Sequence, residues 1–228
     1  MSETAPATAS PAATVILLRD GTSGLETLLL RRNSKLAFHG GSWVFPGGRV
    51  DRADYPDAEG EDEDGAATYA AVREAKEESG LDVDRDSLIY FSHWTTPVGL
   101  PKRFSTWFYL APAPNADVQI DGGEIHDHRW MGASQALAAQ RAGEIELPAP
   151  TFVTLLTLEA FDTLQSVVSA FQGKSATIFL PRNQPVQGGR LSLYQRDAGY
   201  HSETVNAQGP RHRLWMVEGG WRYENTTS

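Results

Sequence analysis

Hydrophobic positions in the first part of the chain form short apolar runs that are separated by turn-forming residues. Two runs, 14–19 and 25–32, flank a turn that is bounded by glycines, and a shorter run at 42–45 ends at Pro46-Gly47-Gly48. Apolar runs of this length between Gly and Pro are typical of β-strands. The pattern therefore predicts three strands, preceded by a disordered tail over residues 1–13.

A helix is predicted next, because residues 65–79 are rich in good helix formers and Gly80 stands where a C-cap glycine is expected. On such a helix Glu74, Glu77 and Glu78 lie three and four positions apart and share one face. Carboxylates that crowd on one face repel one another unless water or a cation screens them. The spacing therefore predicts either a solvated helix face or a cation site.

The remaining pattern alternates strands and helices, and then becomes β-rich. The predicted strands lie at 87–95, 103–111, 118–120, 128–131, 176–180, 191–196 and 213–217, and the predicted helices at 134–142, with Ser134 as N-cap, 151–161 and 164–171. This order of elements predicts an α/β domain over residues 14–172 and a small β-rich C-terminal extension over residues 173–228.

Composition and charge exclude several classes of protein. The chain has no Cys, so disulfides, thiolate metal sites and Cys nucleophiles are excluded. Eight acidic residues and one basic residue lie between positions 51 and 64, and this acidic insertion carries −7 of the net charge of −9. We expect the insertion to be mobile, and the charge argues against nucleic acid as a partner. No apolar run is long enough to cross a membrane or to act as a signal peptide, so no membrane partner and a cytoplasmic location are expected.

A longer pattern resembles a known family. The residues Arg73-Glu74-Ala75-Lys76-Glu77-Glu78-Ser79-Gly80-Leu81 match all nine positions of the tail of the Nudix box, R-E-U-x-E-E-x-G-U, in which U is apolar. Phe45-Pro46-Gly47-Gly48 is similar to the sequence that leads into that box. One position departs from the family, because Asp54 stands where a glutamate is usual and the acidic insertion lengthens this loop. The sequence leaves two alternatives: an acid of the insertion replaces that glutamate, or none does.

The resemblance implies a fold and a chemistry. The fold is the Nudix-type α/β/α sandwich with a mixed sheet, and the cofactor is Mg²⁺ or Mn²⁺, both of which favour oxygen ligands. Glu74, Glu77 and Glu78 would hold the metal, and Arg73 would hold a glutamate in place by ion pairing. Glu124, in the loop before the strand at 128–131, would act as a later catalytic acid or base; an ordinary loop carboxylate is the alternative.

A second resemblance concerns the substrate, which the family implies to be a small nucleotide-type molecule. Residues 29–41, with the long insertion inside the box, are similar to coenzyme A diphosphatases of the peroxisomal type. Coenzyme A or acyl-coenzyme A is therefore the expected substrate, with NADH or ADP-ribose as the alternative. A Nudix-fold module that binds without catalysis is the alternative from another class. The resemblance also implies a homodimer as a candidate assembly.

Basic and glycine residues near the box are the expected substrate contacts. Arg31, Arg32 and Arg103 offer the paired N–H groups that suit phosphate, and Gly47 and Gly48 lie beside them in the implied site. The alternative for each arginine is an ordinary surface charge. The tryptophans on predicted strands are expected in the core rather than stacked on a nucleobase; they are Trp43, Trp94 and Trp107.

Overall fold

A computed structural model describes residues 7–35, 39–55 and 62–227. The chain divides into two compact units. The larger, which we call the α/β unit, comprises Pro11–Ser92 and Thr106–Ala176. The smaller, which we call the β unit, comprises Thr177–Ser228 together with His93–Ser105 and Met1–Ser10, as far as these ranges are described.

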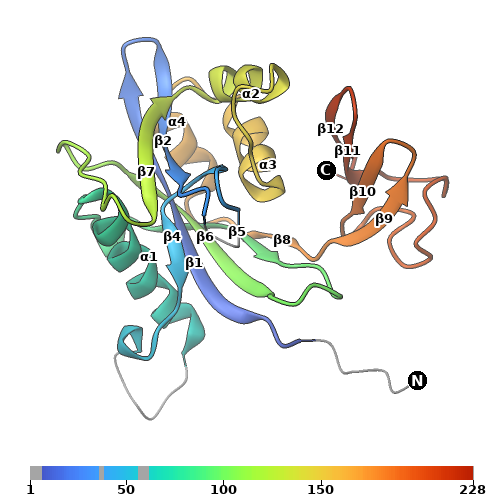
Figure 1. Cartoon of the computed structure of the whole chain (residues 1–228), viewed down its shortest axis with the longest axis horizontal. Coiled ribbons are helices and arrows are strands. Elements are labelled where there is room, and N and C mark those ends of the chain that lie inside the picture. Colours follow the sequence, from blue (N-terminus) through green and yellow to red (C-terminus); the bar gives the residue numbers. More distant parts are fainter. Residues whose placement is uncertain (1–6, 36–38, 56–61, 228) are drawn as a thin grey trace. The chain divides into compact units, whose positions relative to one another are not determined.

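A sheet of eight strands is the main feature of the chain (Figure 1). Its central path runs in the order β3-β2-β1-β6-β5-β8, while β4 pairs with β1 and β7 pairs with β2. The strands are β1 (Ser10–Gly21), β2 (Gly24–Arg32), β3 (Trp43–Val44), β4 (Gly47–Arg49), β5 (Ile89–Thr95), β6 (Phe104–Pro112), β7 (Ile125–Met131) and β8 (Thr177–Phe179).

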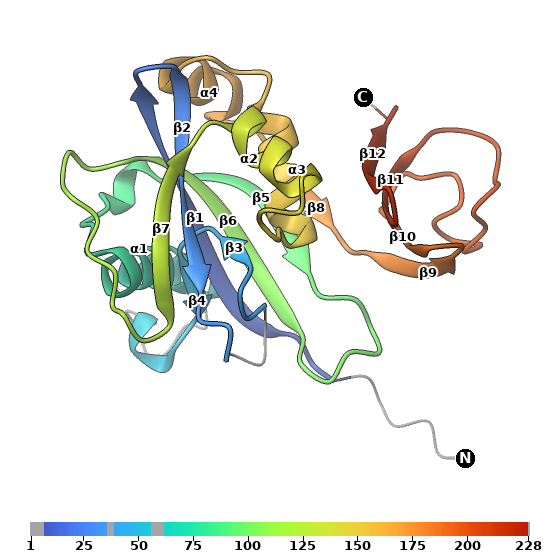
Figure 2. The same ribbon diagram turned by 45° about the horizontal axis from the view of Figure 1, so that its top comes forward.

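Helices cover both faces of this sheet within the α/β unit. Helix α1 (Glu63–Ser79) lies on one face, and α2 (Ala133–Arg141) and α3 (Ala149–Leu158) lie on the other (Figures 1 and 2). Helix α4 (Leu164–Phe171) follows α3 along the chain. Because both faces are covered, β1 reads as a continuous apolar run rather than an alternating one. The predicted α/β class is therefore confirmed, and so is the small second sheet near the C-terminus.

Alanines bring α1 close to the sheet. The buried face of the helix is lined by Ala67, Ala70, Ala71 and Ala75, which pack against strand residues such as Val15 and Leu28. Small side chains let the helix lie near the strands, and the apolar residues on this interface are fully buried. The core therefore fixes the rotation of α1, and Glu74 and Glu78 continue the stripe of buried alanines toward the C-terminal end of the helix, since Ala70, Glu74 and Glu78 are each four residues apart.

The start of the sheet differs from the prediction in two places. Strand β1 begins at Ser10 rather than at residue 14, because Ala12–Thr14 pair with β4 and the Ser10 N–H donates to Arg103 O. The part of the predicted tail before residue 7 lies outside the described residues. The strand at Trp43–Val44 ends before Pro46, as predicted, but Gly47 and Gly48 belong to a further strand, β4, that was not predicted.

Two local predictions further along the chain are wrong. Residues 118–120 form no strand; the Gln119 N–H instead donates to Ser79 O, which fixes this segment against the end of α1. Ser134 is not the N-cap of α2, because the helix begins at Ala133 and is capped by Gly132. The Ser134 hydroxyl donates to Glu159 instead. In both places a tertiary contact decides the local structure.

The acidic insertion over residues 51–64 contains ordered structure at both ends. Residues Arg52–Asp54 form a short 3-10 helix, in which Asp54 is buried, and α1 already begins at Glu63. The expectation of a mobile segment is wrong for these ends, because Asp54 contributes a buried contact. Residues 56–61 lie outside the described part of the chain.

The β unit contains a second sheet of four antiparallel strands in the order β12-β11-β10-β9. The strands are β9 (Arg182–Val186), β10 (Gly189–Leu193), β11 (His212–Val217) and β12 (Gly220–Asn225). Strands β9 and β12 were not predicted, because these edge strands have few buried apolar residues. Arg213 and Asp197 form an ion pair of 2.6 Å inside this unit, with side-chain exposures of 2% and 0%.

The three tryptophans follow the packing expectation. Trp43, Trp94 and Trp107 are 3%, 5% and 6% exposed, so each is part of the core. The Trp107 indole also donates to Asp64 in the first turn of α1. Among the described residues, no helix has the length and apolarity needed to cross a membrane.

Candidate active site on helix α1

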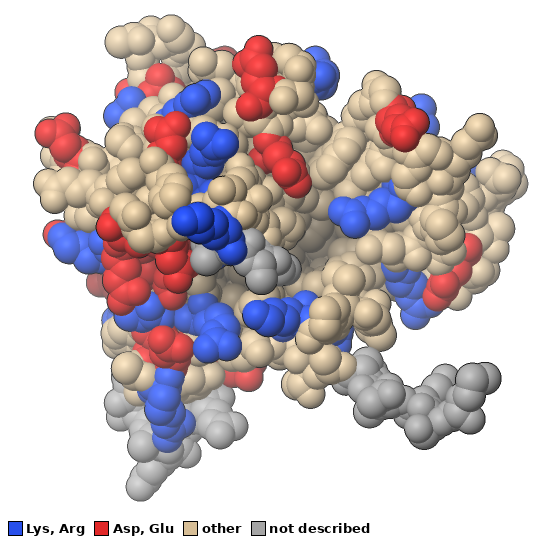
Figure 3. Space-filling model, viewed as in Figure 1, with Lys and Arg blue, Asp and Glu red and all other residues tan. Residues whose placement is uncertain are grey.

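The carboxylates of α1 lie in its last two turns, on the same side of the helix as its buried alanines. Glu74, Glu77 and Glu78 have side-chain exposures of 16%, 58% and 7%. The helix ends at Gly80, whose left-handed conformation and N–H bond to Lys76 O confirm the predicted C-cap. Acidic side chains gather over α1 on the surface, with basic side chains beside them (Figure 3). The helix therefore presents two largely buried carboxylates and one exposed carboxylate on the same face.

Strand β4 lies directly against two of these glutamates. The Gly47 N–H donates to Glu78 Oε2 at 2.9 Å. A Cβ atom on Gly48 would lie 2.3 Å from Glu74 Oε1, and one on Gly47 would lie 2.4 Å from Ala13 O. A side chain at either position would therefore displace its neighbours. The structure shows these glycines as the reason why the strand approaches the helix so closely, and their contact with substrate stays a prediction.

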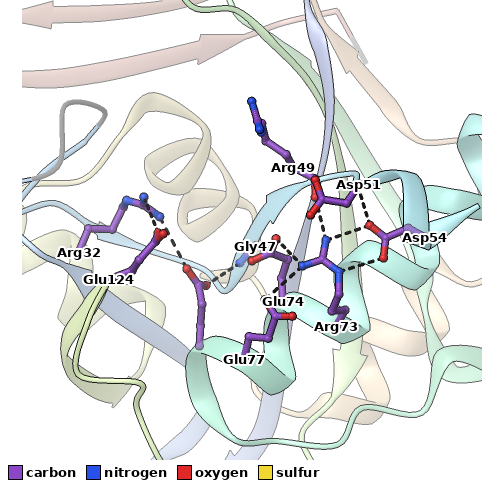
Figure 4. A network of polar contacts seen from close by, with 10 residues as sticks. Arg32, Gly47, Arg49, Asp51, Asp54, Arg73, Glu74, Glu77 and Glu124 are labelled. Carbon is purple, nitrogen blue, oxygen red and sulfur yellow. Dashed lines mark hydrogen bonds and ion pairs between the residues drawn. The ribbon is translucent and has the colours of Figure 1, made fainter.

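Arg73 organises the other side of the site (Figure 4). Its guanidinium donates to both carboxylate oxygens of Asp54 at 2.9 Å, and to Glu74 at 2.9 Å and Glu77 at 3.2 Å. Asp54 is only 4% exposed and also accepts from the Asp51 N–H. Burial alone would raise the pKa of Asp54, but Arg73 and the Asp51 N–H together hold that pKa below its usual value. The lengthened loop therefore supplies Asp54 as a buried acidic partner of Arg73.

Burial makes Glu74 and Glu78 unusually basic. Desolvation is the main cause that raises the pKa of Glu78 to about 8; the charges of Glu74 and Glu124 act in the same direction, while the Gly47 N–H and Arg32 oppose it. Desolvation also raises the pKa of Glu74, although Arg73 opposes the shift. A divalent cation at this place would relieve the mutual repulsion of these groups. The electrostatics therefore favour a cation beside Glu74 and Glu78.

The donor set fits a hard divalent ion. Carboxylate oxygens are the ligands that Mg²⁺ prefers, and Mg²⁺ in proteins usually keeps several waters and binds one or two carboxylates. Within the described ranges, no three Asp, Glu, His or Cys side chains form a group that could hold a metal by themselves. An ion held by one or two carboxylates keeps coordination positions for water and for substrate.

Glu124 reaches the same place from a distant part of the sequence. Its carboxylate accepts from Arg32 at 3.3 Å, although the two residues are 92 positions apart. Arg32 also lies 3.7 Å from Glu78 Oε1. Side chains of Arg32 and Glu124 point toward one another beside the α1 carboxylates in Figure 4. Two of the predicted site residues outside α1 are therefore brought to the helix by the pairing of β2 with β7.

Arg31 and Arg103 are placed differently. Arg31 is exposed on β2, where it pairs with Trp43 of β3. Arg103 belongs to the β unit, and its guanidinium donates to the carbonyl oxygens of Thr96 and Ala7. These backbone contacts give Arg103 a structural role, while a contact of Arg31 or Arg103 with substrate stays a prediction.

Three functional candidates escaped the sequence analysis. Asp54 was recognised only as a departure from the box, and neither Asn33 nor Asp121 was singled out. Both of the latter make hydrogen bonds to the loop that carries Glu124. The sequence could have indicated the role of Asp121, because Gly122-Gly123 follows it. Aspartate followed by glycine is typical of a turn in which the aspartate side chain accepts hydrogen bonds from the backbone.

Comparisons of the sequence with known proteins agree with this geometry. The model of the NUDIX domain matches residues 9–149. The Caenorhabditis elegans protein named "Putative nudix hydrolase 7" is 27% identical over 183 residues, which cover 64% of this chain and 59% of that relative. The chain therefore matches little more than half the length of that relative.

Solved structures share the fold. A NUDIX hydrolase from Alicyclobacillus acidocaldarius superposes with a TM-score of 0.63 at 23% identity, over 75% of this chain and 97% of the other. The NUDIX domain of Shewanella oneidensis NrtR, solved in complex with ADP ribose, superposes with a TM-score of 0.50 at 15% identity, over 68% of this chain and 90% of the other. At these identities the likeness concerns the architecture alone.

Proposed function

Because this chain belongs to the NUDIX family of hydrolases, we propose that it uses a divalent metal ion to hydrolyse a diphosphate bond in a nucleoside diphosphate derivative. One observation carries the proposal. Glu74 and Glu78 lie largely buried against the glycines of β4, and burial is the main cause that raises the pKa of both, with further contributions from neighbouring carboxylates. Buried carboxylates with raised pKa values are typical of a functional site rather than of a solvated helix face.

Each residue of the site has a place in this chemistry. Glu74, Glu77 and Glu78 would hold Mg²⁺ or Mn²⁺. When bound, the metal would neutralise phosphate charge and lower the pKa of the attacking water. Arg73 orients Glu74 and Glu77 by direct hydrogen bonds, and it is held in turn by the buried Asp54. The Gly47 N–H fixes Glu78.

The hydrolysis also needs a proton acceptor and a group that binds phosphate. A P–O bond forms to the water oxygen, the bridging P–O bond breaks, and the proton of the water must leave. Glu124 is suited to take it, because its side chain is 61% exposed at the edge of the site while its carboxylate is held by Arg32. Arg32 is 18% exposed and has N–H groups beyond the one that binds Glu124, so it is suited to bind a phosphate oxygen.

The substrate we propose is coenzyme A or an acyl-coenzyme A. Residues 29–41 and the lengthened box support this choice through their similarity to coenzyme A diphosphatases. NADH and ADP-ribose contain the same type of reactive bond and form the alternative. A binding module without catalysis is disfavoured, because the chain keeps all three glutamates of the box tail.

A substrate screen tests the proposal. The full chain is incubated with coenzyme A, NADH, ADP-ribose or a nucleoside triphosphate, in Mg²⁺, in Mn²⁺ or in EDTA, and the products are separated by chromatography. We expect coenzyme A to be cleaved to phosphopantetheine and adenosine 3′,5′-bisphosphate only in the presence of metal. Binding of one of these compounds without turnover would favour the binding module, and turnover in EDTA would refute the metal-dependent mechanism.

A further inference from the structure

The loop before β7 is folded by one side chain. Asp121 accepts hydrogen bonds from the backbone N–H of Glu124 at 2.8 Å and of Ile125 at 2.9 Å. Gly122 between them has a φ of 71°, a left-handed conformation that glycine adopts without strain. Burial would raise the pKa of Asp121, but these N–H groups hold it below its usual value. The carboxylate of Asp121 therefore stays charged and closes the turn that ends at Glu124.

Asn33 attaches the same turn to the end of β2. Its backbone N–H donates to Glu124 O at 2.7 Å, and its side-chain Nδ2 donates to Gly123 O at 3.0 Å. The Asn33 side chain is itself held, because its Oδ1 accepts from the Lys35 N–H at 3.0 Å. Two consecutive carbonyls of the loop are thus bound by one residue, which restricts the orientation of the peptide before Glu124 and of Glu124 itself.

An irregularity in the sheet brings these groups to the site. The β2–β7 ladder shifts register between Arg31 and Arg32, so that Arg32 pairs with Ile125 rather than with His126. Such a bulge bends the strand and redirects side chains, and bulges are frequent next to active sites. As a result Arg32 binds the side chain of Glu124, while its neighbour Asn33 binds the backbone of Glu124.

We propose that Asn33 and Asp121 are positioning residues that hold the carboxylate of Glu124 beside Arg32 and Glu78 for the hydrolytic step. This inference rests on the function proposed above. Glu124 is exposed and lies in the loop immediately before β7, so its own packing fixes it little. The hydrogen bonds of Asn33 and Asp121 replace the packing that is missing, and a shift of about 1 Å in a reacting group can lower the rate about 100-fold.

Single variants test the roles of both residues. Asn33→Ala removes the Nδ2 donor, and Asp121→Ala removes both acceptors. We expect each to lower kcat by about 10- to 100-fold, while KM and the affinity for Mn²⁺, measured by calorimetry, change less than about twofold. Asp121→Asn keeps one acceptor oxygen and should recover part of the loss. Asp84→Ala is the matched control, because Asp84 also accepts from a backbone N–H in an exposed turn, Asp86 N, and should leave kcat unchanged.

Double variants show whether the effect passes through Glu124. In a Glu124→Gln background, Asn33→Ala and Asp121→Ala should each lower kcat by less than about a further twofold. Residues that act through the same group have effects that do not add. Amide hydrogen exchange in the metal-free protein gives a second readout, in which Asp121→Ala should speed the exchange of the Glu124 and Ile125 amides. Unfolding midpoints close to that of the wild type would show that the fold is intact.

The outcomes separate this inference from the proposed function. If the wild-type chain hydrolyses its substrate and Glu124→Gln lowers kcat, but Asn33→Ala and Asp121→Ala do not, the positioning role is overturned while the proposed function stands. Full additivity in the double variants would overturn it as well. If no metal-dependent hydrolysis is found for the wild type, the proposed function itself fails, and faster exchange in Asp121→Ala would still show that Asp121 orders the loop.

Discussion

The guanidinium of Arg73 binds both carboxylate oxygens of Asp54, with its Nε and Nη2 atoms each 2.9 Å away. Such paired contacts are the strongest form of ion pair in proteins, and this one is partly buried, since the side chains are 26% and 4% exposed. Arg73 also binds Glu74 and Glu77. Asp54, from a short 3-10 helix, therefore determines the geometry of a site that lies on α1.

Asp54→Ala should weaken both the fold and the activity. The change leaves the Arg73 guanidinium without its best partner, which should lower the free energy of unfolding by about 1–3 kcal/mol, as measured by urea denaturation. Arg73 would then be free to move with Glu74 and Glu77, so kcat should fall as well. Asp82→Ala is the control, because its ion pair with Lys76 is exposed and should contribute less than about 1 kcal/mol. Equal effects of the two changes would contradict the role given to Asp54.

Alanine at Gly47 and at Gly48 should have different consequences. At Gly47 the new Cβ would meet backbone atoms of Ala13 and Thr14, which cannot move without shifting β1. We expect a loss of about 1–3 kcal/mol in the free energy of unfolding. At Gly48 the Cβ would meet only the end of the Glu74 side chain, which can rotate away. This variant should remain nearly as stable as the wild type and yet lose metal binding and hydrolysis.

Calorimetric titration with Mn²⁺ and thermal unfolding distinguish the two glycine variants. A Gly48→Ala variant that binds Mn²⁺ as tightly as the wild type would show that metal binding does not depend on the present position of the Glu74 side chain. A Gly47→Ala variant of full stability would show that β4 can move away from β1.

Glu78→Gln should abolish metal-dependent hydrolysis and stabilise the metal-free protein at alkaline pH. The pKa of Glu78 is about 8 in the folded chain and near 4.5 in an exposed carboxyl. Between these values the folded state holds one more proton than the unfolded state, so stability falls as the pH rises through this window. Glutamine has no charge to bury and can still accept from the Gly47 N–H, so this decline should be absent from the variant.

Urea denaturation in EDTA at pH 5 and at pH 9 measures this difference. The stability of Glu78→Gln relative to the wild type should increase by an amount on the order of 1 kcal/mol or more between the two conditions, since one unit of pKa corresponds to about 1.4 kcal/mol. If the free energy of unfolding changed equally with pH in both proteins, the raised pKa of Glu78 would be contradicted. A gain in stability with a loss of activity is the trade-off expected of a functional residue.

Asp197 and Arg213 should control the stability of the β unit. The pKa of Asp197 would be raised by burial, but the bonds from Arg213 and from the backbone hold it below the ordinary 3.8. The stabilisation by the ionised Asp197 is therefore complete at a pH above its ordinary pKa of 3.8, and it is lost as the pH falls through the pKa of the folded state. Arg213→Ala leaves the buried carboxylate of Asp197 unpaired and should lower the free energy of unfolding by about 3–5 kcal/mol.

Limited proteolysis at neutral pH, with mass spectrometry of the fragments, checks this prediction. Arg213→Ala should be cut within residues 177–227 much faster than the wild type. Replacing both partners, as in Asp197→Leu with Arg213→Met, removes the unpaired charge and should restore part of the resistance. If the single variant is as resistant as the wild type, the pair does not stabilise this unit.

The sequence alone was sufficient wherever the structure depends on local geometry. The spacing of Glu74, Glu77 and Glu78 determines a common face, because successive residues of a helix are related by a fixed rotation. Gly80 determines the end of that helix through its left-handed conformation. The apolar runs at β1 and β2 are buried, as their composition predicts, because the sheet is covered on both faces.

Tertiary structure decided which distant groups meet these glutamates. Asp54 binds Arg73, and the Gly47 N–H donates to Glu78 where β4 pairs with β1. Glu124 reaches Arg32 because β7 pairs with β2. These contacts join residues 19, 31 and 92 positions apart. No periodic pattern encodes such distances, since they depend on the register of paired strands and on the packing of the core. The sequence therefore determined which carboxylates share a helix face, and only the folded chain determined which of them are buried and what holds them.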